Sequence, residues 1–186
     1  MKWHSLKNSL FFTAVAILLA AKTFAQHYIP SQEGSDVKFK IKNFGITVTG
    51  SFKGLQGSIS FDEKNISTAA FDVTVESATI NTGVGARDRH LKKDEYFDVV
   101  NHPKIRMKST KITPADKEGW LYFFGTLTIK GITKEISFPF KVRQQNEGLL
   151  FTADFKMNRR DYKVGGNSFS LADNLIVYLS VFAKKP

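Results

Sequence analysis

The sequence has 186 residues, a formal charge of +10 and no cysteine, and 17 of its residues are Phe. The lack of cysteine excludes disulfide frameworks and thiolate-based metal or catalytic sites. A chain this rich in aromatic rings and this poor in reactive groups is typical of a container and not of a catalyst.

The first 25 residues have the pattern of a secretory signal peptide. Lys2 and Lys7 precede an apolar run from 10 to 21, and Thr23-Phe24-Ala25 supplies small residues at the two positions that a signal peptidase reads. The run is shorter than the ~20 residues that cross a bilayer. We therefore expect cleavage after Ala25, export to the periplasm, and one mature domain over 26–186 with no membrane span.

Losing three lysines and no acids with that segment lowers the formal charge from +10 to +7. The lysines are spread along strands, as where Lys38, Lys40 and Lys42 alternate with apolar neighbours. Nucleic-acid sites instead gather charge into one patch with stacking aromatic side chains. We expect no nucleic-acid partner, whereas transient contact with an anionic membrane surface stays open.

Alternating apolar and polar residues predict several strands in the first half of the chain. The expected strands cover residues 37–41, 46–52, 59–61 and 71–76. Phe44-Gly45 is predicted to form a turn, and Gly50, Gly54 and Gly57 lie where glycine often marks bulges and sharp bends.

Between Thr82 and His102 the period changes from that of a strand to that of a helix. Val84, Arg87, Leu91 and, further on, Tyr96-Phe97 suit one or two short helices, and Asp94 would cap the second. The remaining strands are expected near 105–107, at 120–143 as a hairpin that turns at Gly131, at 149–157 and at 175–182. In total this indicates eight or nine strands with one helical interruption, the pattern of an antiparallel barrel or a sandwich.

The last strand is apolar on both faces, so its outer side is either covered or part of an interface, and a homodimer through Tyr178 is one alternative. The chain has no HExxH motif, no GxSxG turn and no nucleotide-binding glycine loop. We therefore predict no metal site and no catalytic residue.

Two polar clusters stand out. In Arg87-Asp88-Arg89-His90 the acid and the imidazole are two residues apart, so a helix would point them away from one another. An Asp88–Lys92 salt bridge or a guard at an opening fits better. Arg159-Arg160-Asp161-Tyr162 is either a loop held by an Arg–Asp pair or a polar collar around a ligand head group.

The chain resembles the YceI-like family of exported bacterial proteins over nearly all of residues 26–186. The matching pieces are Phe39-x-Ile41-x-x-Phe44-Gly45, Val48-x-Gly50-x-Phe52-x-Gly54, Gly57-x-Ile59-x-Phe61-Asp62, Ser77-x-x-Ile80-Asn81-Thr82-Gly83, Arg87-Asp88-x-His90-Leu91-Lys92, Tyr96-Phe97-Asp98-Val99, His102-Pro103-x-Ile105, Gly125-x-Leu127-Thr128-Ile129-Lys130-Gly131-Ile132-Thr133-Lys134 and Arg159-x-Asp161-Tyr162.

The resemblance implies a single lipocalin-like antiparallel β-barrel, often dimeric, that binds a polyisoprenoid, an isoprenoid quinone or a similar amphiphilic lipid and requires no other cofactor. The chain departs from the family at three places. Gly34-Ser35 and Asn43 stand where members often carry histidines, and Tyr162 stands where Phe is usual.

We therefore expect a non-catalytic carrier of a long isoprenoid chain. The residues expected to line its interior are Phe39, Ile41, Phe44, Phe52, Phe71, Val73, Leu91, Phe97, Ile105, Met107, Phe123, Leu127, Phe138, Phe140, Phe151, Phe155 and Tyr162. Arg87, Asp88, Arg159 and Asp161 are the candidate polar rim.

Two alternatives stay open at this point. The Phe rings could fill the barrel, because an interior of eight strands is just wide enough either to be packed or to hold one slender ligand. A filled barrel would be an interaction module. An exported enzyme with Asp88, His90 or Asp161 as acid or base is the other alternative.

Overall fold

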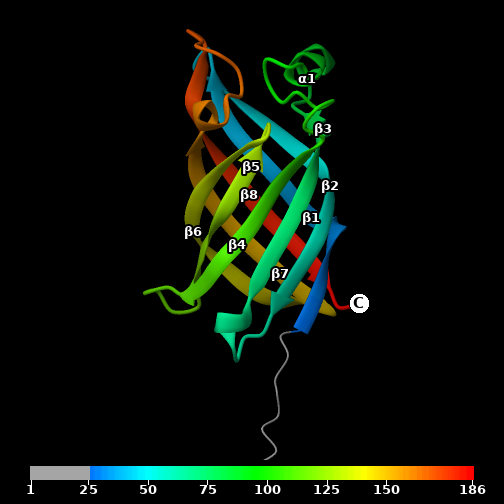
Figure 1. Ribbon diagram of the computed structural model, residues 1–186, viewed down its shortest axis with the longest axis vertical. Coiled ribbons are helices and arrows are strands. Elements are labelled where there is room, and N and C mark those ends of the chain that lie inside the picture. Colours follow the sequence, from blue (N-terminus) through cyan, green and yellow to red (C-terminus); the bar gives the residue numbers. More distant parts are fainter. Residues whose placement is uncertain (1–25) are drawn as a thin grey trace, which may run out of the picture.

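The computed structural model describes residues 26–186, so the expected signal peptide lies outside the described residues. Eight antiparallel strands close into one barrel in chain order, with β8 pairing back onto β1 (Figure 1). The strands are β1 (Gln26–Asn43), β2 (Ile46–Phe61), β3 (Ala70–Asn81), β4 (Lys104–Pro114), β5 (Leu121–Ile129), β6 (Ile132–Gln145), β7 (Gly148–Asn158) and β8 (Leu171–Lys184). The structure confirms the antiparallel barrel and rules out a sandwich.

Three short helical segments lie between strands, namely η1 (Ile66–Thr68), α1 (Gly85–Leu91) and η2 (Arg159–Tyr162). Of the one or two helices predicted for the insertion, the structure has one, α1, and no second helix follows Asp94. Residues 92–103 form turns, and the Asp94 carboxylate accepts one hydrogen bond, from the neighbouring Glu95 N–H. Among residues 26–186, the structure has no helix that is both long and apolar enough to cross a bilayer.

The two strands predicted at 46–52 and 59–61 are one strand, β2. Its pairing with β3 shifts register between Lys53 and Gln56, where Gly54 has a φ of 74°. A residue with a side chain adopts that backbone conformation only at a cost. The glycine therefore bends the strand as predicted, but it does not end it.

The two ends of the barrel are built differently (Figure 1). The β1–β2, β3–β4, β5–β6 and β7–β8 connections meet at one end, which also carries α1 and η2, and we call it the mouth end. Both described termini lie at the opposite, closed end, together with the β2–β3, β4–β5 and β6–β7 connections.

Five phenylalanines fill the closed half of the barrel, and we call them the aromatic plug (Phe61, Phe71, Phe123, Phe140 and Phe151). The ring of Phe71 stands edge-on to the other four, with centroid distances from 5.2 to 6.5 Å. Edge-to-face pairs at such distances add to the free energy gained from burial. The plug therefore forms the central part of the core.

Near the closed end, the outer face of β8 is covered by its neighbour β1 at Phe182. The Phe182 ring packs against Gly34, and the Ser35 hydroxyl accepts a hydrogen bond of 2.8 Å from the Phe182 N–H. These residues belong to a bulge of β1, where the register with β8 shifts between Ser31 and Asp36. Of the two alternatives for the outer side of this strand, Phe182 is thus covered by the chain itself and is not part of an interface.

Removing the central ring of the plug should be costly. We expect Phe71→Ala to lower the free energy of unfolding by about 3–5 kcal/mol, because four rings lose their common partner. Phe124→Ala, at a ring that is 39% exposed on β5, should change it by less than about 1 kcal/mol. Urea unfolding followed by circular dichroism measures both, and equal losses would contradict a plug-centred core.

Candidate ligand cavity

A cavity of about 320 Å³ occupies the mouth half of the barrel. Every strand except β6 contributes to its wall, together with both long connections of the mouth end. Ten of the residues expected to line the interior border this cavity: Phe39, Ile41, Phe52, Val73, Leu91, Phe97, Ile105, Met107, Leu127 and Phe155.

Five predicted lining residues lie below the cavity, so the expectation that they line it is corrected. Phe71, Phe123, Phe140 and Phe151 belong to the aromatic plug. Phe138 is stacked between Phe123 and Phe155, at centroid distances of 4.8 and 4.5 Å, and belongs to the floor on which the cavity rests. The rings therefore fill one half of the barrel and line the other.

Two further predicted lining residues also lie elsewhere. Phe44 is 72% exposed at the β1–β2 turn, because the turn points its side chain away from the barrel. Tyr162 is 2% exposed and packs with Leu127, Ile129 and Val164 in a separate cluster beneath η2.

Several aliphatic residues of the wall were not among the predicted lining residues. The residues concerned include Val75, Ile129, Met157, Leu175, Val177 and Leu179. Several of them stand two positions from a predicted residue, as Ile129 does from Leu127 and Met157 from Phe155. The alternation along each strand is therefore a sufficient signal for these residues.

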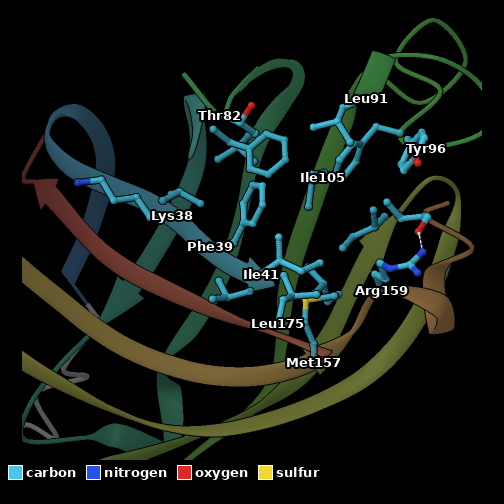
Figure 2. Close-up of a pocket in the computed structure, with 18 of the residues that line it drawn as sticks. Lys38, Phe39, Ile41, Thr82, Leu91, Tyr96, Ile105, Met157, Arg159 and Leu175 are labelled. Carbon is cyan, nitrogen blue, oxygen red and sulfur yellow. Dashed lines mark hydrogen bonds between the residues drawn. The ribbon is translucent and has the colours of Figure 1, made fainter. Parts of the chain in front are cut away.

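The β3–β4 connection forms a roof over the cavity. The Phe97 ring stands edge-on to Phe52 at 5.4 Å, and Phe52 in turn lies 5.8 Å from the Phe39 ring. Phe39 can lie flat across β2 because position 50 is glycine, where a Cβ atom would come within 2.2 Å of the ring. Figure 2 shows Leu91 and Tyr96 above the apolar side chains of the strands, while the side chain of Lys38 points away.

Thr82, Arg87 and Asp88 join α1 to the end of β3. The Asp88 carboxylate accepts hydrogen bonds from the Thr82 N–H at 2.9 Å and from the Thr82 hydroxyl. The Arg87 guanidinium donates to the Thr82 hydroxyl at 2.7 Å and to its carbonyl at 2.8 Å. Asp88 thus binds Thr82 and not Lys92. Of the two predicted rim residues on α1, Arg87 borders the cavity and Asp88 does not.

Arg159 holds the β7–β8 connection from inside. Its side chain is 4% exposed, and it forms an ion pair of 2.7 Å with Asp173, whereas the predicted partner Asp161 is exposed at the surface. Its other N–H groups donate to the carbonyls of Val164, Gly166, Leu171 and Ala172. All five donors of the guanidinium are therefore used within the protein, which makes Arg159 an organiser of the wall.

The polar groups that border the cavity stand mainly at its mouth. They include Asn43, Thr82, His90, Tyr96, Ser168 and Ser170. The His90 and Tyr96 rings lie edge to face at 4.9 Å. Of the three residues considered as an acid or a base, only His90 borders the cavity, and the described chain holds no group of three potential metal ligands.

This arrangement suits an apolar chain that enters from the mouth end. The inner wall offers it Phe, Leu, Ile, Val and Met side chains, and the rim offers hydroxyl, amide and imidazole groups to a polar end. Pockets of this kind bind mainly through apolar contact and take their orientation from a few polar groups.

The buried phenol of Tyr162 predicts an effect of alkaline pH. Burial raises the pKa of Tyr162 to about 12, and the charge of Asp161 adds to the shift. In the unfolded chain the pKa is ~10, so this contribution to stability is present below pH ~10 and is lost as the pH rises toward 12. Tyr162→Phe should remove that loss.

Urea unfolding of both proteins at several pH values checks this, because lysine ionisation is common to both and cancels in the difference. Parallel stability curves from neutral to strongly alkaline pH would contradict the burial of the phenol.

Comparison with known proteins places the chain in a family. Residues 28–183 match the model of the YceI-like domain. A UPF0312 protein of Pectobacterium carotovorum subsp. carotovorum is 34% identical over 146 residues, which cover 76% of this chain and 74% of that protein.

Two solved structures share the fold. BcnA of Burkholderia cenocepacia has a TM-score of 0.78 at 21% identity, covering 83% of this chain and 99% of that one. A polyisoprenoid binding domain from Saccharophagus degradans has a TM-score of 0.69 at 15% identity, covering 87% and 99%. With its matched domain extending over almost every described residue, the chain belongs to the YceI-like family.

Proposed function

We propose that the protein is an exported, non-catalytic carrier that holds the hydrocarbon tail of an isoprenoid lipid in the mouth half of its barrel. The observation that carries this proposal is the cavity itself, which is apolar along its depth and polar at its opening. A volume of about 320 Å³ is at the lower end of the ~300–1,000 Å³ typical of ligand pockets. The cavity thus takes the inner part of a tail and leaves the head group at the rim.

The energetics favour a tail of this kind. Each buried methylene contributes about 0.8 kcal/mol, so a few isoprene units bind well without any buried polar partner. Branched methyl groups fit a wall made of alternating rings and branched aliphatic side chains better than they fit a smooth tube. The Saccharophagus degradans domain, described as polyisoprenoid binding, supports the same ligand class by analogy of fold.

Three of the four charged groups expected at the rim are already engaged within the protein. Arg159 has no N–H left for a ligand, and Arg87 and Asp88 are engaged with Thr82. The signal peptide expected at 1–25 would deliver the mature domain to the periplasm.

Native mass spectrometry of gently purified protein, followed by organic extraction, tests the proposal. We expect a bound lipid and the uptake of an added isoprenoid quinone. Met107→Trp should abolish uptake because the larger ring fills the cavity, whereas Lys108→Trp, on the outer face of the same strand, should bind normally. If Met107→Trp does not fold, Val177→Phe provides the same test. Protein that never contains or takes up lipid would contradict the proposal.

The roof should control the rate of exchange. Phe97→Ala removes the ring that closes over Phe52, so we expect bound quinone to leave faster while the barrel keeps its stability. Val100→Ala, at an exposed position of the same connection, is the matched control. Transfer of a fluorescent isoprenoid to an excess of acceptor protein gives the rate, and equal rates for the three proteins would argue against a roof.

A further inference from the structure

Exposed apolar side chains gather at one end of the molecule. Of the seven large hydrophobic residues that are exposed within residues 26–186, five lie at the mouth end. They are Phe44, Ile46, Val84, Val100 and Phe169. Single exposed apolar residues are ordinary on protein surfaces, but a cluster beside an opening marks an interaction site.

Phe44 and Phe169 stand on neighbouring connections. The Phe44 N–H donates a hydrogen bond of 2.8 Å to the carbonyl of Ser170, and Asn43 pairs with Leu171. Figure 1 shows the β1–β2 turn beside the β7–β8 connection at the tip of the mouth end. Phe169 is fully exposed, at 103%, and Phe44 is 72% exposed. We call Phe44, Ile46 and Phe169 the tip patch.

The backbone of Phe44 makes its side chain unusual at this place. Phe44 and Gly45 have φ angles of 49° and 74°, the conformation of a tight hairpin turn with both central residues in the left-handed region. Asn followed by Gly is favoured there, and a bulky residue costs conformational free energy. The ring of Phe44 is exposed, so its burial within this chain does not offset the cost of that backbone conformation.

The charges at the two ends differ in sign. The four connections at the mouth end contain eight Lys or Arg and five Asp or Glu, whereas the three at the closed end contain two and five. Exposed Lys42 lies two residues before Phe44, and exposed Lys163 lies in the same connection as Phe169, six residues before it. Aromatic rings among basic residues suit the interface of a bilayer that contains anionic lipids.

We propose that the tip patch inserts into the head-group region of an anionic bilayer, so that the opening of the cavity faces the membrane. The docking explains how a carrier of the proposed function would reach its ligand. A second copy of this chain fits the patch less well, because a twofold contact would bring the basic rims of both copies together.

Flotation with vesicles of phosphatidylglycerol and phosphatidylethanolamine tests the proposal on protein purified after expression of the full sequence. We expect binding that weakens with salt and that is absent with phosphatidylcholine vesicles. The double variant Phe44→Asn/Phe169→Ser should bind at least ~10-fold more weakly, because two rings no longer leave water. Phe124→Ser, at an exposed ring on the side of the barrel, should bind like the parent protein.

Stability separates a docking defect from a folding defect. Phe44→Asn creates the favoured Asn-Gly turn, so the single variant should unfold at the same temperature as the parent or a higher one. Quinone added in detergent micelles measures lipid uptake independently of vesicles. A double variant that takes up quinone normally but does not float supports the proposal.

Three results would overturn the docking. The first is a parent protein that takes up quinone from micelles but does not bind anionic vesicles, which leaves the carrier function intact. The second is a double variant that floats like the parent. The third is a parent protein that does not bind vesicles and a double variant that changes from dimer to monomer in light scattering. The last outcome would assign the tip patch to a second copy of the chain.

Discussion

The edge-to-face packing of Phe71 with four other rings is the interaction on which the remaining architecture depends. An eight-stranded barrel is narrow, and its interior must bury enough apolar surface to offset the entropy of ordering the chain. Because most of that apolar surface is buried in the closed half, the mouth half does not have to be tightly packed for the barrel to be stable. The upper strands are held in place by their continuation into the plug, so side chains there can border empty space.

The mouth is kept in shape by polar anchors together with the small apolar cluster around Tyr162 beneath η2. Arg159 gathers four carbonyls and the Asp173 carboxylate, and Thr82 is held by both Arg87 and Asp88. Buried hydrogen bonds of this kind fix a backbone in one arrangement, since each group left without a partner would be costly. Such anchors leave no room for competing loop positions, yet they consume little of the apolar surface that the cavity needs.

The sequence predicted whether a strand residue points into or out of the barrel better than it predicted how far from the mouth the residue lies. Phe39 and Phe71 have the same pattern of neighbours, but Phe39 borders the cavity and Phe71 fills the plug, because depth depends on the register between strands. The partner of Arg159 was out of reach for a similar reason. Asp161 is two residues away and looks obvious, whereas Asp173 becomes adjacent only when β8 returns beside β7. The spacing around Tyr96-Phe97 fits either one or two helices, and the structure forms turns there that carry Phe97 over the cavity.

The opposite charges of the two ends have a consequence that acts before any contact is made. Separated along the length of the barrel, they give the protein an electric dipole parallel to its axis. In the field of a negatively charged surface such a molecule experiences a torque, which turns the basic end inward while the protein is still about a Debye length away. Approach is thus biased toward the one orientation in which the opening faces the surface.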